Sequence, residues 1–194
     1  MISKDKEKQK EINKNKRKLD KILSTFLADI TILVDQQEKQ NSHIINYFDN
    51  LNIKYEVMHL ETGDYSFIYD KVDFSDLFSL ERKNSMQELV ASMFASRFEK
   101  EIARGNKMLY FEIFVEKSSL NDLLVGNYKI DPNSDKHKDV EKKIKDSKDC
   151  IRKMFYSRKA EYNLQFNFLG SPGLSGQYIL GNIKYFLRNF LLHS

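Results

Sequence analysis

The sequence predicts an α/β fold in which helices flank a central mixed β-sheet. Short apolar runs typical of buried strands alternate along the chain with segments whose apolar residues recur at helical spacing. Only seven glycines and two prolines occur in 194 residues, which argues against a turn-dense β-sandwich. Hydrophobic residues make up 41% of the chain, enough for the core of one domain of ordinary size.

The first half of the domain is predicted to be rich in strands. Apolar runs and alternating patterns predict strands over 30–35, 53–60, 65–69 and 77–83. Helical spacing of Ile44, Phe48 and Leu51 predicts a helix over 41–51, with Asn41 or Ser42 as its cap. A turn over 62–64 separates the second strand from the third.

A long helix is predicted to follow, from Ser85 to Gly105. Ser85 is followed three residues later by Glu88, as in a capping box, and Gly105 lies where a helix would end. The remaining pattern predicts a central strand over 108–115, a long loop over 118–138, a helix over 139–159, a strand over 164–169, a loop over 171–173 and a helix over 177–192.

Positive charge is concentrated in two segments. The whole chain has a formal net charge of +4, but residues 1–21 hold +5 and residues 136–159 hold +6, which leaves the rest at −7. Residues 1–21 contain too few apolar residues for a core, so we interpret them as a basic flexible arm before a single domain over 22–194. The two segments favour a polyanionic partner, although by charge alone a solvated surface is the simpler interpretation.

Several classes of protein are excluded by what the sequence lacks. The single cysteine, Cys150, cannot form an intramolecular disulfide and fits a reducing, cytoplasmic location. No apolar run is long enough for a membrane span, and no cleavage-like site follows the lysine-rich start. The absence of a phosphate-binding loop, a dinucleotide fingerprint and a Cys/His cluster argues against a nucleotide cofactor and a structural zinc site.

A candidate catalytic site lies in two short segments, Gly63-Asp64-Tyr65 and Glu81-Arg82-Lys83. Alternation along a strand places Glu81 and Lys83 on one face, and a neighbouring strand would begin at Asp64. Two carboxylates suit Mg²⁺, and an ammonium group beside them can orient water or offset charge on a phosphate. The spacing alone is a weak signal, because Glu-x-Lys occurs by chance in many surface strands.

Four segments, taken together, resemble the XPF-type structure-specific endonucleases of the restriction-endonuclease-like superfamily. In order along the chain they are ILVDQQE (32–38), GDY (63–65), ERKNSMQEL (81–89) and RF (97–98). Their order and gaps match the family over about residues 30–115, and the C-terminal part looks like the end of compact bacterial and phage versions. The resemblance implies a restriction-endonuclease-like nuclease domain.

The resemblance also implies roles for the matching residues. Asp35, Asp64 and Glu81 match metal-binding acids, so Mg²⁺ or Mn²⁺ is the implied cofactor. Lys83 matches the catalytic lysine. Arg82 matches the arginine of the same tripeptide, which is expected to hold the site together or to touch phosphate.

Further matches concern the surroundings of the site and the contact with DNA. Glu38 matches the acid that closes the first motif, and Arg97 matches a basic position expected to face DNA. The helix-hairpin-helix region of larger family members has no counterpart here, so DNA must be held by the domain, its basic segments or a partner. Within 136–159 we expect phosphate contacts from Arg152, Lys153, Arg158 and Lys159.

Two positions depart from the family pattern. The first motif has Gln37 where the family has arginine, and Gln87 occupies a position that is usually aspartate. Glu88 follows directly but is turned by about 100° around the helix, so it is no simple replacement. These departures keep open the alternative of a catalytically weak or inactive DNA-binding module that acts with a partner.

We therefore predict a divalent-metal-dependent DNA endonuclease that is directed by DNA structure, such as a flap, fork or junction. Backbone-directed cations read no base sequence, which favours recognition of structure over recognition of sequence. A nucleotidyl transferase is a poorer hypothesis, because no glycine-rich loop is present to cradle a nucleotide. The family often pairs its nuclease domains, so a homodimer or a partner protein is a further expectation.

Overall fold

The computed structural model describes residues 26–126 and 148–193, together with the isolated positions 6, 10, 13, 14 and 17. The predicted arm over 1–21 therefore lies almost wholly outside the described residues, as does the 136–147 part of the basic segment. None of the helices in the described ranges combines the length and the apolar character needed to cross a bilayer.

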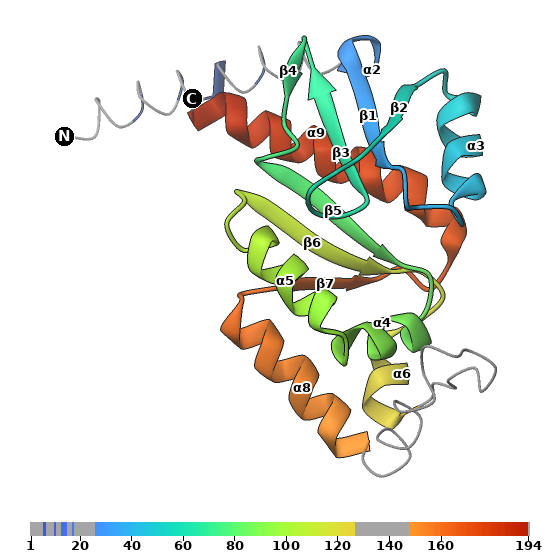
Figure 1. Ribbon diagram of the computed structural model, residues 1–194. Helices are drawn as coiled ribbons and strands as arrows, with labels where there is room; N and C mark the ends of the chain where they lie inside the picture. Colours follow the sequence, from blue (N-terminus) through green and yellow to red (C-terminus); the bar gives the residue numbers. More distant parts are fainter. Residues whose placement is uncertain are drawn as a thin grey trace.

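The described strands form one seven-stranded mixed sheet in the order β2-β1-β3-β5-β6-β7, with the short β4 paired to β3 (Figure 1). Their bounds are β1 Ile30–Asp35, β2 Lys54–Met58, β3 Tyr65–Tyr69, β4 Val72–Asp73, β5 Phe78–Lys83, β6 Tyr110–Val115 and β7 Gln165–Phe168. β3 runs antiparallel to both β1 and β5, whereas β5, β6 and β7 are parallel. The carboxyl ends of β1, β5 and β6 and the amino end of β3 consequently meet at one edge of the sheet.

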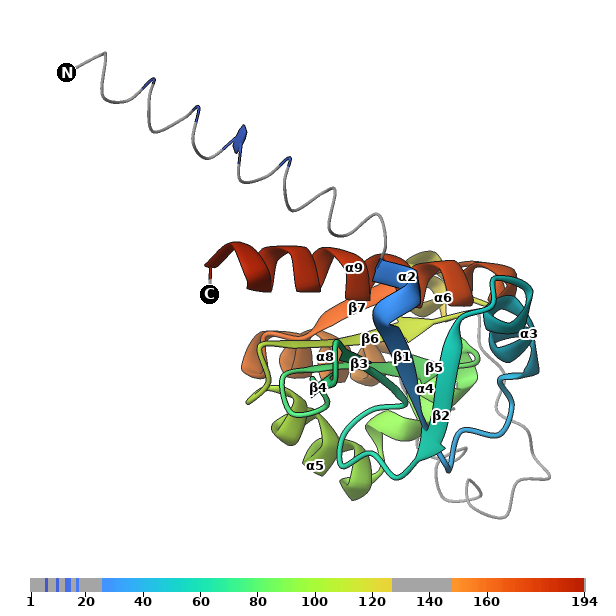
Figure 2. The same cartoon turned by 90° about the horizontal axis from the view of Figure 1, so that it is seen from above.

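Helices cover both faces of this sheet. Their bounds are α2 Phe26–Asp29, α3 Ser42–Asn50, α4 Met86–Met93, α5 Ser96–Gly105, α6 Leu120–Val125, α8 Lys148–Glu161 and α9 Ser175–His193, with a 3₁₀ turn at Pro172–Leu174. α3 and α9 lie on one face, and α4, α5, α6 and α8 lie on the other (Figures 1 and 2). This arrangement confirms the predicted mixed sheet flanked by helices.

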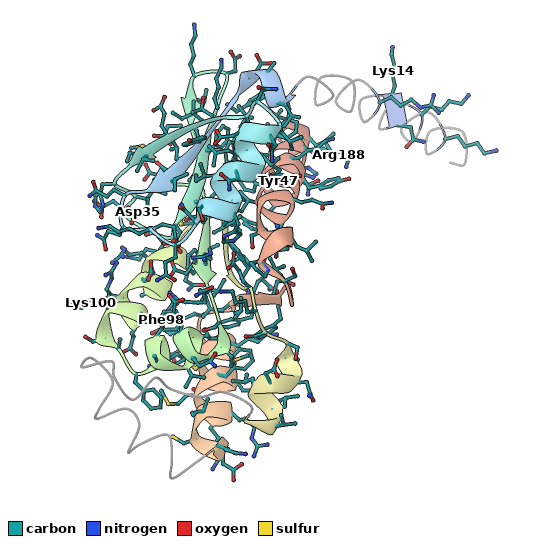
Figure 3. The ribbon with its side chains drawn as sticks, turned by 90° about the vertical axis from the view of Figure 1, so that its right-hand side faces the viewer. Lys14, Asp35, Tyr47, Phe98, Lys100 and Arg188 are labelled. Carbon is teal, nitrogen blue, oxygen red and sulfur yellow. The ribbon has the colours of Figure 1, made fainter. Side chains whose placement is uncertain are left out.

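One half of the core lies beneath α3 and α9. Ile30, Ile32 and Val34 alternate along β1 and are fully buried against this layer, as strand periodicity requires. α3 packs against α9 through Tyr47, next to Gly176, where a Cβ atom would lie only 2.4 Å from the tyrosine ring (Figure 3). Glycine at this position therefore lets the two helices approach closely.

The second half of the core lies beneath α4, α5, α6 and α8. Met86 and Leu89 of α4 and Ile151 and Phe155 of α8 are buried there against β6 and β7. β6 faces both halves, since Ile113 belongs to one cluster and its neighbour Phe114 to the other. The predicted central strand is confirmed, although it begins at Tyr110 and not at 108, since Leu109 is exposed.

The single helix predicted over 85–105 is wrong, because the chain breaks between α4 and α5. Ala95 has an extended conformation, with φ −93° and ψ 130°. In an uninterrupted helix, the stripe through Met86 and Met93 would next bury Arg97. The break shifts the phase, so that Phe98 and Ile102 are buried and Arg97 is exposed.

The long loop predicted over 118–138 is also wrong in its first part. Residues 120–125 form α6, which begins with a capping box between Ser119 and Asp122 and ends at Gly126 with φ +70°. Its six residues are too few to produce a clear periodic signal, although Leu123 is fully buried. Residues 127–138 lie outside the described ranges.

Candidate active site at the strand edge

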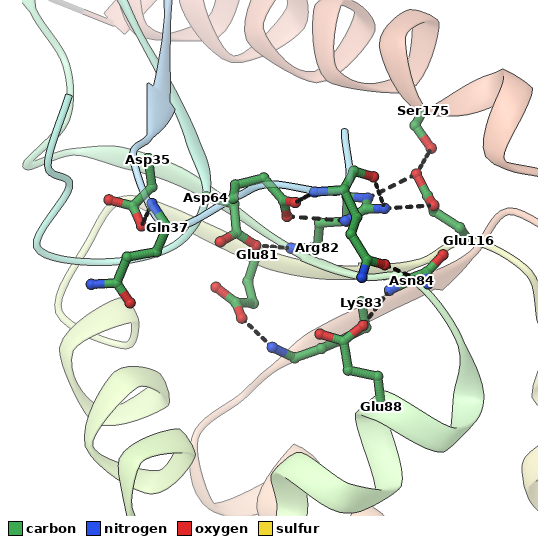
Figure 4. Close-up of polar contacts among 12 residues, drawn as sticks. Asp35, Gln37, Asp64, Glu81, Arg82, Lys83, Asn84, Glu88, Glu116 and Ser175 are labelled. Atoms are coloured by element: carbon green, nitrogen blue, oxygen red, sulfur yellow. Dashed lines mark hydrogen bonds and ion pairs between the residues drawn. The ribbon is translucent and has the colours of Figure 1, made fainter. Parts of the chain in front are cut away.

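The sheet edge described above opens into a pocket of about 580 Å³. Asp35 lies at the end of β1, Asp64 lies directly before β3, and Glu81 and Lys83 lie at the end of β5 (Figure 4). The topology thus gathers into one cavity groups that are up to 48 residues apart in the chain.

The position of Asp64 is set by its backbone. Gly63 has φ +71°, and a Cβ atom added to it would lie 2.1 Å from Ser79 Oγ, so only glycine fits this turn. The carbonyl oxygen of Asp64 accepts from the Asp35 amide at 2.9 Å, and Asp64 Oδ2 accepts from the Arg82 amide at 2.7 Å. The backbone of Asp64 is therefore held by β1 and its carboxylate by β5.

Glu81 and Lys83 point to the same face of β5 and are both buried. The Lys83 ammonium donates to Glu81 Oε1 and lies 5.7 Å from the centre of the Phe98 ring. Glu81 is only 3% exposed, and its Oε2 atom has no hydrogen-bond partner within residues 26–126 and 148–193. A buried carboxylate oxygen without a partner is costly, unless a ligand completes it.

The electrostatics of the pocket favour a cation. Burial, followed by the nearby Glu81 charge, raises the pKa of Asp64 well above its usual value. Burial raises the pKa of Glu81 to about 7; the Lys83 charge opposes this rise, whereas the charge of Glu101 adds to it. Burial lowers the pKa of Lys83, but the carboxylates of Glu81 and Asp64 outweigh that effect and raise it, so this residue stays an ammonium.

The donor set fits Mg²⁺ or Mn²⁺. Magnesium is commonly held by one or two carboxylates and keeps several waters. Asp64 and Glu81 supply two carboxylates, and one oxygen of Glu81 has no hydrogen-bond partner among the described residues. In the part of the chain that the structure describes, no three His, Cys, Asp or Glu side chains are grouped closely enough to enclose a metal ion.

Asp35, predicted as a third ligand, lies at the side of this pair. Its Oδ1 accepts from the Leu60 amide at 3.0 Å, and its Oδ2 accepts from the Gln37 amide at 3.1 Å. Asp35 thus ties the loops after β1 and β2 together while lining the same pocket. Its role as a metal ligand stays a prediction.

Arg82 points to the opposite face of β5, toward α3 and α9. Its guanidinium lies 2.9 Å from Glu116 Oε1 and donates to Glu38 Oε2 at 3.0 Å and to the carbonyl oxygen of Gln40 at 2.8 Å. Arg82 and Glu38, both predicted from the sequence, therefore join β5 to the loop after β1.

Glu116 is a buried acid that the sequence pattern did not predict as part of the site. It is fully buried just after β6, where it accepts from Ser175 Oγ at 2.6 Å and contacts His43 Nε2 at 2.7 Å, in addition to Arg82. Burial acts to raise the pKa of Glu116, but its hydrogen bonds from Arg82, Ser175 and His43 outweigh this effect and lower it. The signal that could have revealed Glu116 is the presence of an acidic residue directly after a predicted central strand.

Of the two departures from the family pattern, Gln37 lines the pocket, whereas Gln87 is a half-buried residue of α4 that is not part of the pocket lining. Gln37 Oε1 accepts from Arg97 Nη2 at 2.9 Å, so Gln37 holds the exposed Arg97 beside the pocket. Glu88, which follows Gln87, accepts from the Asn84 amide at 2.9 Å through its carboxylate, while its own amide donates to Ser85 Oγ. Ser85 therefore caps α4, and Glu88 holds the residue that precedes the cap.

The four basic residues predicted on α8 divide into two pairs. Arg152 donates to the carbonyl oxygen of Leu124 at 2.9 Å, and Arg158 donates to Glu99 at 3.1 Å. Lys153 and Lys159 are exposed. The arginines thus attach α8 to its neighbours, while the lysines face solvent.

Comparison with solved structures shows that this fold is similar to that of XPF. XPF from Aeropyrum pernix matches with a TM-score of 0.54 and 16% identity, over 81% of this chain and 65% of that chain. The same protein in complex with DNA matches with a TM-score of 0.54 and 16% identity, over 82% of this chain and 66% of that one. A search of curated protein sequences gives no match.

The family model described as the ERCC4 domain matches residues 34–156, which include every candidate site residue except Arg158 and Lys159. The chain belongs to the ERCC4 domain family. The predicted resemblance to XPF-type nucleases is therefore confirmed.

Proposed function

We propose that the protein is a divalent-metal-dependent DNA endonuclease that hydrolyses phosphodiester bonds at this pocket. The observation that supports it best is the buried carboxylate of Glu81, which lines the pocket with Asp64. One of its oxygens accepts from the Lys83 ammonium, and the other has no hydrogen-bond partner among the described residues. A bound cation would stabilise these buried negative charges. Two carboxylates and a lysine are also suited to the transfer of a phosphoryl group to water.

In this proposal, Asp64 and Glu81 hold Mg²⁺ or Mn²⁺. When bound, the cation would polarise a phosphate oxygen and increase the acidity of water. Lys83 orients the attacking water or offsets the charge that develops on the phosphate, since its ammonium is fixed by Glu81. Water oxygen bonds to phosphorus, the bond from phosphorus to the leaving sugar oxygen breaks, and that oxygen takes up a proton.

The proposed substrate is DNA of particular structure, such as a flap, fork or junction. Arg97 lies exposed at the rim of the pocket, and Lys153 and Lys159 are exposed on α8. Phosphate-directed cations position a duplex without reading its bases. A homodimer or a partner protein would supply a further contact surface and stays part of the proposal.

Cleavage assays on labelled duplex, flap and four-way-junction DNA test this function. With Mg²⁺ or Mn²⁺, wild-type protein should give products that Glu81→Ala and Lys83→Ala do not give, while both variants retain DNA binding. Unchanged cleavage by either variant would overturn the site assignment.

A binding module without nuclease activity is the second candidate function. Gln37 and Gln87 occupy positions where the family carries an arginine and an aspartate, which removes one cation and one anion near the site. Salt-dependent DNA binding by wild-type protein without any cleavage would favour this candidate.

A further inference from the structure

Glu101 enters the same pocket from α5. It lines the cavity together with Asp64 and Glu81, and its Oε1 accepts from the Gly63 amide at 3.3 Å. Glu101 is thereby fixed against the turn that positions Asp64. The break at Ala95 makes this placement possible, because it sets the phase of α5.

Glu101 therefore brings a further carboxylate to the wall of the pocket that Asp64 and Glu81 also line. The pocket is lined by seven acidic side chains, Glu101 among them, and by five lysines and arginines. A divalent cation would offset this excess of two negative charges.

We propose that Glu101 is a third carboxylate of the cation site and binds the metal ion through an intervening water. This inference rests on the proposed function, since it concerns the same metal. An outer contact agrees with the finding that no three such side chains in the described ranges are grouped closely enough to hold an ion directly. Mg²⁺ favours such contacts, because it usually keeps several of its waters.

A second observation points to a bound cation in this pocket, and it does not depend on how close the three carboxylates lie to one another. The Oε2 atom of Glu81, which is 3% exposed, has no hydrogen-bond partner among the described residues. A metal ion held by this atom would keep waters of its own, and the Glu101 carboxylate could accept hydrogen bonds from them.

Mn²⁺ titration by calorimetry or electron paramagnetic resonance tests the proposal on the full chain. Glu101→Gln keeps an oxygen acceptor for the Gly63 amide and removes the charge. We expect it to weaken Mn²⁺ binding by about 10-fold or more, as is typical when a group behind the metal ligands is removed. Glu99→Gln is the matched control, because Glu99 lies on the same helix but pairs with Arg158; it should bind Mn²⁺ like wild type.

Unchanged Mn²⁺ affinity in a folded Glu101→Gln variant would overturn the role of Glu101 and leave the proposed nuclease standing. If this variant does not fold, Glu101→Asp takes its place, and an affinity equal to that of wild type would again contradict the proposal. Failure of the wild-type protein both to bind Mn²⁺ and to cleave DNA would overturn the proposed function first, and this inference with it.

Discussion

Gly63 determines where the Asp64 carboxylate lies. Gly63→Ala would force a Cβ into a turn with φ +71°, 2.1 Å from Ser79 Oγ. We expect it to reduce the free energy of unfolding by about 2 kcal/mol or more, because strain and overpacking add together. Urea denaturation measures this decrease.

Gly181 provides a matched control in the middle of α9. Apart from its chain neighbours and the backbone of its own helix, no atom of the described residues lies within 4 Å of a Cβ built on Gly181. Gly181→Ala should therefore raise the free energy of unfolding by about 0.5–1 kcal/mol. Equal stability of Gly63→Ala and wild type would contradict the explanation of the turn.

Glu116 makes a pH-dependent contribution to stability. Its pKa is lowered in the folded protein below the usual 4.5, so its contribution is complete above pH 4.5 and is lost as the pH falls through the folded value. At neutral pH, Glu116→Gln should reduce the free energy of unfolding by about 2–3 kcal/mol, because the buried Arg82 loses a charged partner.

Thermal or urea unfolding of wild type and Glu116→Gln across the acid range measures this effect. The difference between the two proteins should shrink as the pH decreases below 4.5. Ser171→Ala, on the exposed loop before the 3₁₀ turn, is a suitable control. The difference in its free energy of unfolding from that of wild type should not change with pH. A difference for Glu116→Gln that stays constant with pH would exclude the proposed charge pairing.

At the scale of single residues, strand periodicity was enough to predict that Glu81 and Lys83 share a face. The partners of Arg82 could not be predicted, because they come from segments far apart in the sequence: Glu38 and Gln40 follow β1, and Glu116 follows β6. Only the three-dimensional arrangement of β1, β5 and β6 brings these groups together.

The elements themselves were largely predictable where their period was strong. All described strands of three or more residues lie within or close to predicted runs, because buried strands leave continuous apolar patterns. The break between α4 and α5 was not predictable from capping signals, since Ala95 is neither glycine nor proline. The sequence does show the break as a shift in the helical phase of the buried residues between Met93 and Phe98. The same shift determines the position of Glu101 on α5.

α8 provides a test that separates DNA binding from packing. Lys153→Ala combined with Lys159→Ala should weaken DNA binding and reduce the slope of log affinity against log salt by about 0.9 for each phosphate that the variant no longer neutralises. Both lysines are exposed, so the free energy of unfolding should change by less than about 0.5 kcal/mol. Fluorescence anisotropy at several salt concentrations measures the slope.

Arg158→Ala is the contrasting variant on the same helix. Arg158 donates to Glu99 and to the carbonyl oxygen of Met93, so its removal should lower the melting temperature. A salt slope unaffected by the double lysine variant would show that this side of α8 does not bind DNA.

For the molecule as a whole, one basic segment precedes the domain, the other lies within it, and the remainder of the chain is acidic. Residues 1–21 carry a net charge of +5 but few apolar residues. Deletion of residues 1–20 should therefore weaken DNA binding, most strongly at low salt, and leave the melting temperature unchanged. A large decrease in melting temperature would mean that this segment contributes to the core.

The most direct test of the central claim compares cleavage of one labelled flap substrate by wild type, Asp64→Asn and Glu61→Gln. Glu61 is a rim acid whose side chain is 85% exposed, so it serves as the control for removal of a negative charge. We predict products with Mg²⁺ and none with EDTA, a decrease of about 10²–10³-fold for Asp64→Asn, and little change for Glu61→Gln. Cleavage that persists in EDTA, or that proceeds at the wild-type rate in Asp64→Asn, would contradict a metal-dependent site at this strand edge.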